Sequence, residues 1–227
     1  MSDAALVSVI IPVYNGERYL GEALRSVFAQ DYPRFEVLVV DDGSTDGSRR
    51  IAESFGDVRL MSGPHQGVSG ARNHAAAAAK WDFLAFLDAD DTWHPRKLSE
   101  QVALAMAEPQ LGMVMVFQDY RFEGPVPAWF RGPTDGSAEP GFLPSSWLLR
   151  RECWESVGPF AADLTHGEDI DWLARARHRG VEIGTVQHCL LTRRIHDANV
   201  SGISHAARRG LLASLRASIE RKHGVVP

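Results

Sequence analysis

Short apolar runs alternate with amphipathic stretches along the first half of the chain. Runs rich in Val, Ile, Leu and Phe predict buried strands at 6–12, 35–40, 58–61 and 83–87. Apolar residues at helical spacing predict helices at 18–30, from the DDGSTDGS turn to about 55, at 71–79 and after Pro95. Alternating strands and helices indicate right-handed crossovers, so we expect an α/β fold with a mostly parallel central sheet flanked by helices.

The second half of the chain is less regular. We expect a strand at 113–120, an irregular Pro- and Gly-rich loop at 121–141, helices near 151–157 and 168–178, a strand at 181–195 and a basic amphipathic helix at 204–222. A chain of 227 residues is long enough for one α/β domain and short for two. We therefore expect one domain over 1–227, with 1–120 and 121–203 as its halves and 204–227 as a C-terminal helix.

Charge and hydropathy exclude some classes of partner. The formal net charge of -5 gives no basic footprint for nucleic acid. The apolar run at 4–13 has no basic leader and is too short to span a bilayer, and no later segment approaches the roughly 20 apolar residues of a spanning helix. We expect a cytoplasmic protein without a transmembrane segment. The helix at 204–222 is either a solvated face or a peripheral contact with the inner face of a membrane or with a partner.

The polar loops that follow the predicted strands should meet at one edge of the sheet, because ligands of open α/β sheets bind outside the carboxyl ends of the strands. Asp88-Ala89-Asp90-Asp91 directly follows the apolar run FLAFL. Carboxylates this close repel one another unless a cation lies among them, and hard ions such as Mg²⁺ or Mn²⁺ prefer oxygen ligands. The alternative is a solvated acidic turn in which Asp91 or Thr92 caps the next helix.

Two other loops carry weaker signals. In Asp41-Asp42-Gly43-Ser44, a carboxylate could accept hydrogen bonds from a base or ribose, and the alternative is a turn with a helix cap. In the loop at 12–17, Tyr14 could stack on a nucleobase, and the alternative is an ordinary turn. This loop is not GxGxxG, which disfavours a dinucleotide site.

Later segments add charged candidates. Arg72 lies where a Gly- and Ser-rich loop enters a helix and could pair with phosphate, an ordinary helix start being the alternative. Glu168 and Asp169 open a helix after Gly167; acidic residues suit the helix dipole there, and a rigid helix start would also hold a general base. His196 follows the last predicted strand and is either a surface histidine or part of a metal or diphosphate site.

Taken in order, these segments resemble the family 2 glycosyltransferases, which have the GT-A fold. The matching segments are VSVIIPVYNGERYL, FEVLVVDDGSTDGS, GVSGARNHA, FLAFLDADD, GEDIDWLARARHRG and RIHDANVSG. They extend from Val7 to about Gly202, and the ordered set is specific although each piece alone is not. The loop at 121–141 and the residues after Gly202 have no matching signature.

The resemblance implies a metal-assisted, inverting transfer of a sugar from a nucleotide diphosphate donor to an acceptor hydroxyl. The first expectation for the donor is a UDP-sugar, and the acceptor would be a glycan, a lipid-linked sugar or another glycoconjugate. Residues 1–120 would hold the nucleotide sugar, whereas 121–203 would carry the acceptor and catalytic groups.

The resemblance also assigns roles to individual residues. The donor contacts it implies are Pro12, Tyr14, Glu17, Asp42, Arg72 and Asp88. The divalent metal, Mn²⁺ or Mg²⁺, would be held by Asp90, with Asp91 as the alternative, and assisted by His196. Asp169 would be the general base, with Glu168 beside it at the acceptor.

Two other functions stay open. A sugar-nucleotide pyrophosphorylase shares the βαβ opening and the acidic site, but should carry a Gly-rich loop with Arg or Lys where this chain has PVYNGERYL. A non-catalytic nucleotide-sugar-binding or scaffold protein would have no need for Asp169. The loop at 121–141 is long enough to order over a donor and exclude water, which we treat as a hypothesis.

Overall fold

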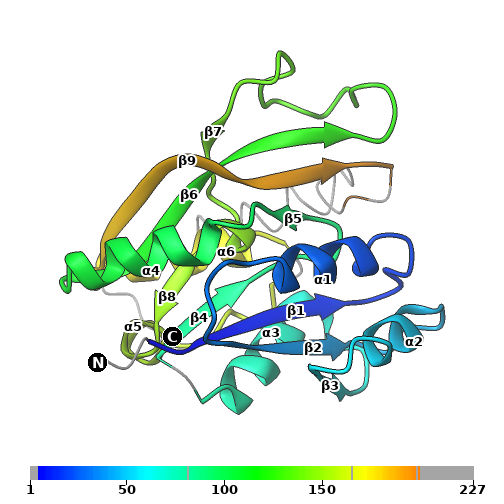
Figure 1. Ribbon diagram of the computed structural model, residues 1–227, viewed down its shortest axis with the longest axis horizontal. Helices are drawn as coiled ribbons and strands as arrows, with labels where there is room; N and C mark the ends of the chain where they lie inside the picture. Colours follow the sequence, from blue (N-terminus) through cyan, green and yellow to red (C-terminus); the bar gives the residue numbers. More distant parts are fainter. Residues whose placement is uncertain (1–4, 81, 165, 198, 200–227) are drawn as a thin grey trace.

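The computed structural model describes residues 5–80, 82–164, 166–197 and 199. The helix expected at 204–222 and the end of the RIHDANVSG segment lie outside the described residues. Within the described residues, nine strands form one sheet, and helices cover both of its faces (Figure 1). This arrangement confirms the α/β fold expected from the sequence.

Parallel strands form the N-terminal half of the sheet. In spatial order they are β3 (Val58–Ser62), β2 (Phe35–Asp41), β1 (Val7–Val13) and β4 (Phe83–Phe86). They are connected by α1 (Leu20–Phe28), α2 (Ser48–Glu53) and α3 (Gly67–Ala78). β1 is buried on both faces, since Val9 and Ile11 pack into one core and Ile10 into the other. Such continuous apolar strands are typical of a parallel sheet with helices on both sides.

The second half of the chain extends the same sheet. Its strands are β8 (Leu148–Arg150), β6 (Leu111–Phe122), β9 (Glu182–Ile195), β5 (Thr92–Trp93) and β7 (Glu139–Pro140). β8 pairs antiparallel with β4 and with β6, whereas β6 and β9 form a long parallel pair. Because the antiparallel pairings are short, most paired residues are in parallel register.

Two hydrophobic cores lie on the two faces of the sheet. The helices α1 and α2 and α4 (Lys97–Ala107) supply one core. The other is supplied by α3, α5 (Arg151–Val157) and α6 (Glu168–His178). Trp147 and Trp172 are fully buried in this second core, with their ring centroids 5.4 Å apart. A short 3₁₀ turn, Pro144–Ser146, precedes β8.

Some elements differ from the expectation. α3 begins at Gly67 and not at 71, because Asp42 accepts hydrogen bonds from the main-chain N–H groups of Gln66 (2.8 Å) and Gly67 (2.9 Å) and so satisfies the start of the helix. The strands β5, β7 and β8 were not expected; they are too short to show a periodic pattern. Among the described residues, no helix is both long and apolar enough to span a membrane.

Candidate active site

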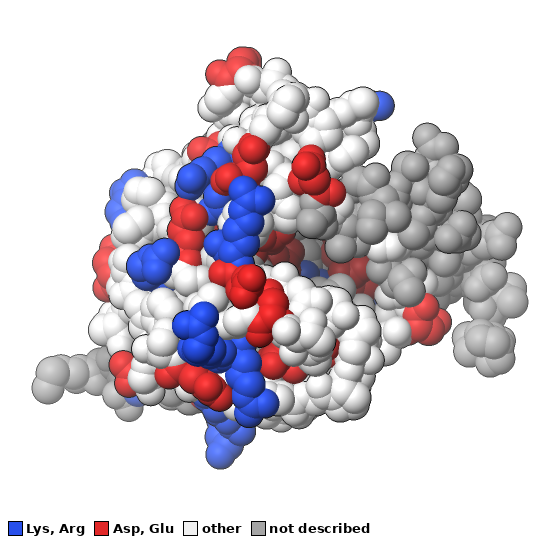
Figure 2. Space-filling model, turned by 90° about the vertical axis from the view of Figure 1, so that its right-hand side faces the viewer, with Lys and Arg blue, Asp and Glu red and all other residues white. Residues whose placement is uncertain are grey.

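The carboxyl ends of β1, β2 and β4 lie at one edge of the sheet, where a cavity of about 920 Å³ opens. Acidic side chains gather in and around the recess on this face (Figure 2). The expected site residues that line the cavity are Pro12, Tyr14, Arg72, Asp88, Asp90, Asp91, Glu168, Asp169 and His196. Residues that lie up to 184 positions apart in the chain therefore meet in one cavity.

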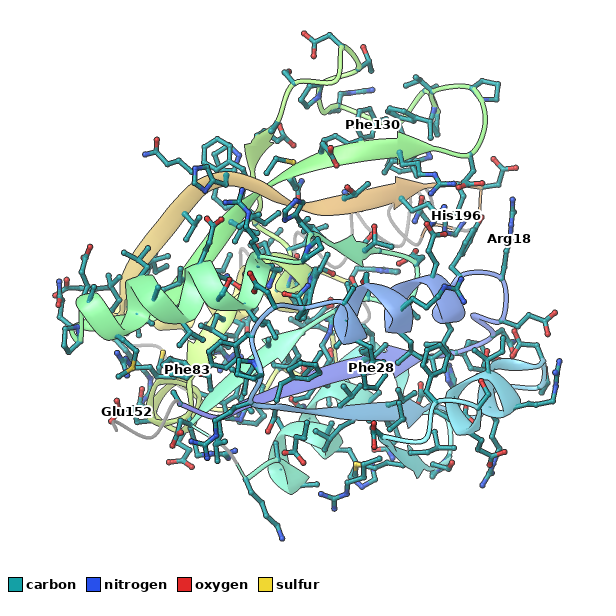
Figure 3. All side chains as sticks on the ribbon, in the orientation of Figure 1. Arg18, Phe28, Phe83, Phe130, Glu152 and His196 are labelled. Carbon is teal, nitrogen blue, oxygen red and sulfur yellow. The ribbon has the colours of Figure 1, made fainter. Side chains whose placement is uncertain are left out.

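Asp90 faces two side chains from the segment that follows β9. Its Oδ2 lies 3.1 Å from Nε2 of His196 and accepts a hydrogen bond from Nδ2 of Asn199 at 3.2 Å. The His196 ring packs against the ring of Tyr19, with centroids 4.8 Å apart. Figure 3 shows His196 at the end of β9, at the same edge of the sheet as Arg18 of the loop after β1. These contacts hold the carboxylate and the imidazole toward each other.

The pair of Asp90 and His196 fits a divalent metal. Carboxylate oxygen and imidazole nitrogen are donors that Mn²⁺ accepts, and the Asp90 side chain is 30% exposed to the cavity. Within the part of the chain that the structure describes, no three His, Cys, Asp or Glu side chains converge as a complete metal cage. The protein would thus hold the ion through few ligands and leave the other positions to substrate phosphates and water, as is usual for Mg²⁺-type sites.

The two neighbouring carboxylates are engaged in different contacts. Asp91 is 3% exposed and its Oδ1 accepts the main-chain N–H of Arg194 at 3.1 Å. Burial, followed by the charges of Asp90 and Asp88, raises the pKa of Asp91 well above its ordinary value. Asp88 accepts a hydrogen bond from Arg72 at 2.6 Å. Asp90 is thus the acidic residue of this loop with a carboxylate directed at His196.

Arg194 joins three segments around the acidic loop. Its Nε donates to the main-chain oxygen of Asp90 at 3.0 Å, and its Nη2 donates to Glu22 at 2.6 Å. Nη1 pairs with Glu123, and the guanidinium lies 4.6 Å from the ring centroid of Tyr19. With only 3% of its surface exposed, Arg194 fixes the main chain at Asp90 against both the start of α1 and the end of β6.

The first turn of α6 places two carboxylates at the cavity. Gly167 precedes the helix with φ +79°, a left-handed conformation that glycine adopts without steric cost. Glu168 is buried, and Asp169 is half-buried beside it. Burial, together with the charge of Glu168, raises the pKa of Asp169 to about 6. A carboxylate with this pKa can accept a proton near neutral pH, which is the property of a general base.

Arg72 connects this helix with the acidic loop. Its Nη1 donates to Glu168 at 2.9 Å and its Nη2 donates to Asp88 at 2.6 Å. The residue is only 2% exposed, and its guanidinium pairs with two carboxylates at the cavity wall. Arg72 thereby bridges the acidic loop after β4 and the first turn of α6.

Tyr14 lines the cavity and is 51% exposed. Its ring packs against the ring of His65 at 4.2 Å, and His65 Nδ1 lies 2.8 Å from Asp42 Oδ2. Asp42 and Glu17 do not line the cavity. Asp42 binds the start of α3, and Glu17 accepts the main-chain N–H of Gly47 at 2.6 Å, so both carboxylates support neighbouring loops.

The loop after β6 forms part of the cavity wall. Glu123, Gly124, Pro125 and Pro127 line the cavity, whereas Phe130 is 8% exposed. The Phe130 ring lies edge-on to the rings of Tyr120 (4.7 Å) and Phe122 (5.1 Å) on β6. Figure 3 shows Phe130 against the upper strand of the sheet. This anchor divides the loop into a cavity-lining part and an outer part.

Sequence reasoning missed the roles of several residues. Arg194 and Asn199 lie within the RIHDANVSG segment, and Tyr19 lies on a predicted helix face, but their contacts with the acidic loop depend on the tertiary fold. His65 carried no signal at all. The presence of several polar residues around His196 in one short segment was the available hint that more than one of them belongs to the site.

Comparisons with known proteins identify the family and the fold of this chain. Residues 8–156 match the model of the family described as glycosyl transferase family 2. A curated relative is the UDP-Glc:alpha-D-GlcNAc-diphosphoundecaprenol beta-1,3-glucosyltransferase WfgD of Escherichia coli, which is 39% identical over 107 residues, or 46% of this chain. The chain spans less than half the length of several curated relatives, 42% in the case of WfgD.

Solved structures share the fold. TarS 1–349 of S. aureus in complex with UDP-GlcNAc superposes with a TM-score of 0.78 at 21% identity, over 94% of this chain and 65% of that chain. The mannosyltransferase PcManGT of Pyrobaculum calidifontis, in complex with GDP-Man and Mn²⁺, superposes with a TM-score of 0.71 at 23% identity, over 100% of this chain and 66% of that one. These likenesses confirm the GT-A fold. Together with the family match, they establish that the chain belongs to glycosyl transferase family 2.

Proposed function

We propose that this protein transfers a sugar from a nucleotide diphosphate donor to an acceptor hydroxyl, with inversion at the anomeric carbon. The observation that carries the proposal is that Asp90 with His196, and Asp169 with its raised pKa, line the same cavity at the carboxyl edge of the sheet. One group of residues suits a metal-bound diphosphate and the other suits an attacking hydroxyl. A scaffold protein would require only the first group.

The donor would lie along the cavity from Tyr14 to Asp90. Tyr14 is exposed and offers a ring on which a nucleobase can stack, although His65 already packs against the Tyr14 ring. Asp90 and His196 would hold a divalent metal, which, when bound, neutralises the negative charge that grows on the leaving diphosphate. Known structures of the same fold hold UDP-GlcNAc or GDP-Man, which supports testing UDP- and GDP-sugars first.

The acceptor would lie at α6. Asp169 accepts the proton of the acceptor hydroxyl as that oxygen attacks the anomeric carbon from the face opposite the diphosphate. Glu168, held by Arg72, lies beside the base. The E. coli relative glucosylates a sugar on diphosphoundecaprenol according to its name, which supports a lipid-linked acceptor as the first class to test. In this scheme, residues 1–120 hold the donor, and residues 121–203 supply the base and the acceptor wall.

Calorimetric titration tests the donor half of this proposal. We expect one class of nucleotide, UDP, GDP or dTDP, to bind with Mn²⁺ and to bind at least about tenfold more weakly with EDTA. A sugar-nucleotide pyrophosphorylase would in addition consume a sugar 1-phosphate with a nucleoside triphosphate, which we expect this protein not to do. Failure of all three nucleotides to bind would contradict the proposal.

A further inference from the structure

We propose that Arg72 and Asn73 of α3 act as a clamp that positions the first turn of α6, and with it Asp169, against the acidic loop after β4. In this arrangement Arg72 is a positioning residue and not a ligand of the donor phosphates. The inference rests on the proposed function, because it assigns the role of general base to Asp169. It goes further in giving two neighbouring residues of α3 a joint task.

The first contact of the clamp is the double pairing of Arg72. The guanidinium reaches Glu168 Oε1 with one nitrogen (2.9 Å) and Asp88 Oδ1 with another (2.6 Å). The Arg72 side chain is 3% exposed, and that of Glu168 is 11% exposed. Because a planar guanidinium holds its donors in a fixed fork, the pair fixes the distance between the acidic loop and the start of α6.

The second contact is made by the next residue. The Asn73 side chain donates to the main-chain oxygen of Phe160 (2.9 Å) and accepts its main-chain N–H (2.9 Å). The Phe160 ring is buried against Trp147 and Trp172, and the Arg72 guanidinium lies 5.5 Å from its centroid. The segment that leads into α6 is therefore held at Phe160 by Asn73 and at Glu168 by Arg72.

The positive charge of Arg72 offsets the negative charges of the carboxylates around it. Asp88 and Glu168 both contact it, and Asp169 is near enough for the positive charge to lower the pKa of its carboxyl. Glu168 acts on Asp169 in the opposite direction. Without Arg72, the three carboxylates would repel one another, so the first turn of α6 would move away from the acidic loop and Asp169 would hold its proton to higher pH.

Nucleotide binding and donor turnover distinguish a clamp from a phosphate ligand. The variants are Arg72→Met, Arg72→Lys and, as a control, Arg59→Met, which removes an exposed arginine that contacts the C-terminal end of the same helix (Ala78 oxygen, 3.3 Å). We expect the nucleotide that wild type binds with Mn²⁺, UDP, GDP or dTDP, to bind Arg72→Met within about threefold of the wild-type affinity. We expect donor hydrolysis, measured as nucleotide release, to fall about a hundredfold, because a small displacement of the base costs this much.

The pH profile adds a second readout. In Arg72→Met, the acidic limb of the pH profile of donor turnover should move to higher pH than in wild type, because a positive charge near Asp169 is lost. Arg72→Lys should reverse part of this shift. Loss of nucleotide affinity by about tenfold or more, with an unmoved acidic limb, would overturn the inference and make Arg72 a donor ligand.

Hydrogen exchange tests the clamp without any turnover. We expect peptides covering 158–171 to exchange faster in Arg72→Met and in Asn73→Ala than in wild type or Arg59→Met. Unchanged exchange in both variants would overturn the inference. If Arg72→Met does not fold, Arg72→Lys and Asn73→Ala supply the same comparison. If wild type turns over no donor, the proposed function fails, whereas the exchange result still decides whether the clamp exists.

Discussion

His196 Nε2 lies 3.1 Å from Asp90 Oδ2, although the two residues are 106 positions apart in the chain. Asp90 belongs to the loop after β4, and His196 follows β9 directly. The contact exists because β9 runs beside β5, with Thr92 opposite Thr192, so that the end of β9 returns to the loop that carries Asp90. The proposed metal site therefore depends on the pairing of β9 with β5 and not on the acidic loop alone.

Substitution of Asp90 should weaken metal binding. We expect Asp90→Asn to lower Mn²⁺ affinity in the presence of UDP roughly tenfold to a hundredfold, with a smaller loss for His196→Ala. Free Mn²⁺ is measured by electron paramagnetic resonance. Asp57→Asn, at an exposed carboxylate outside the cavity, is the matched control and should bind Mn²⁺ like wild type. Equal affinities for the Asp90 and Asp57 variants would show that the metal is held elsewhere.

The raised pKa of Asp169 predicts a pH dependence of the rate. The carboxyl must be ionised to accept a proton, and its pKa is raised from 3.8 to about 6. The rate of donor turnover should therefore fall below about pH 6, approaching a tenfold loss per pH unit. A rate that stays flat from pH 7 down to pH 5 would argue against Asp169 as the base.

The same shift predicts a pH-dependent effect on the stability of the fold. A carboxyl whose pKa is higher in the folded than in the unfolded protein binds more protons when folded, so its contribution to stability falls as the pH rises from about 3.8 to about 6. Asp169→Asn should remove this contribution. Urea unfolding of wild type and Asp169→Asn at pH 4.5 and pH 7 measures it, and equal differences at both pH values would contradict the shift.

Arg194 and Arg121 form a matched pair for a test of burial. Both contact Glu22 and Glu123, but the Arg194 side chain is 4% exposed and that of Arg121 is 55% exposed. We expect Arg194→Lys to lower the free energy of unfolding by about 2 kcal/mol, because a lysine cannot replace the fork that also reaches the main chain of Asp90. Arg121→Lys should cost less than about 1 kcal/mol. Equal losses in urea unfolding would mean that Arg194 contributes only a surface ion pair.

Phe130 and Phe142 offer a similar comparison in and beside the loop after β6. Phe130 is 8% exposed and packs on Tyr120 and Phe122, whereas Phe142 is 58% exposed. Phe130→Ala should release the middle of the loop and accelerate trypsin cleavage after Arg131, while Phe142→Ala should not. Cleavage at the wild-type rate in Phe130→Ala would show that the aromatic anchor does not hold the loop.

The packing of Phe130 limits which part of the loop at 121–141 could order over a donor and exclude water. Because Phe130 is already packed, only the part before it, which includes Pro125 and Pro127 in the cavity wall, is placed to close over a donor. We expect nucleotide and Mn²⁺ to protect this part in hydrogen exchange and to leave the exchange of the outer part unchanged.

Much of the fold could be predicted from the sequence because its strands are long apolar runs. β1, β2 and β4 are buried on both faces and were expected within about one or two residues of their observed bounds. The start of α3 could not be predicted, since it depends on Asp42, which lies 25 positions before Gly67 and satisfies the first N–H groups of the helix. The short strands β5 and β8 exist only because longer neighbours pair with them.

The sequence indicated candidate residues for the site, but it did not indicate the side-chain contacts among them. The acidic loop, Asp169 and His196 were chosen as candidates because each follows a strand or opens a helix, and the structure places them at one cavity. The bridge from Arg72 to Glu168 spans 96 positions, and no local pattern indicates such a pairing. Glu17 and Asp42 were expected at the donor from their loops alone. In the structure, their carboxylates accept hydrogen bonds from neighbouring main-chain N–H groups, which no local pattern indicates.

The most direct test of the proposed sugar transfer is the release of nucleotide from a panel of UDP-, GDP- and dTDP-sugars with Mn²⁺, by wild type and by Asp169→Asn. We expect wild type to turn over one class of donor. We expect Asp169→Asn to bind the same nucleotide but to release it from the donor at least about a hundredfold more slowly. Turnover by Asp169→Asn at the wild-type rate, or no turnover of any donor by wild type, would contradict the proposed transfer.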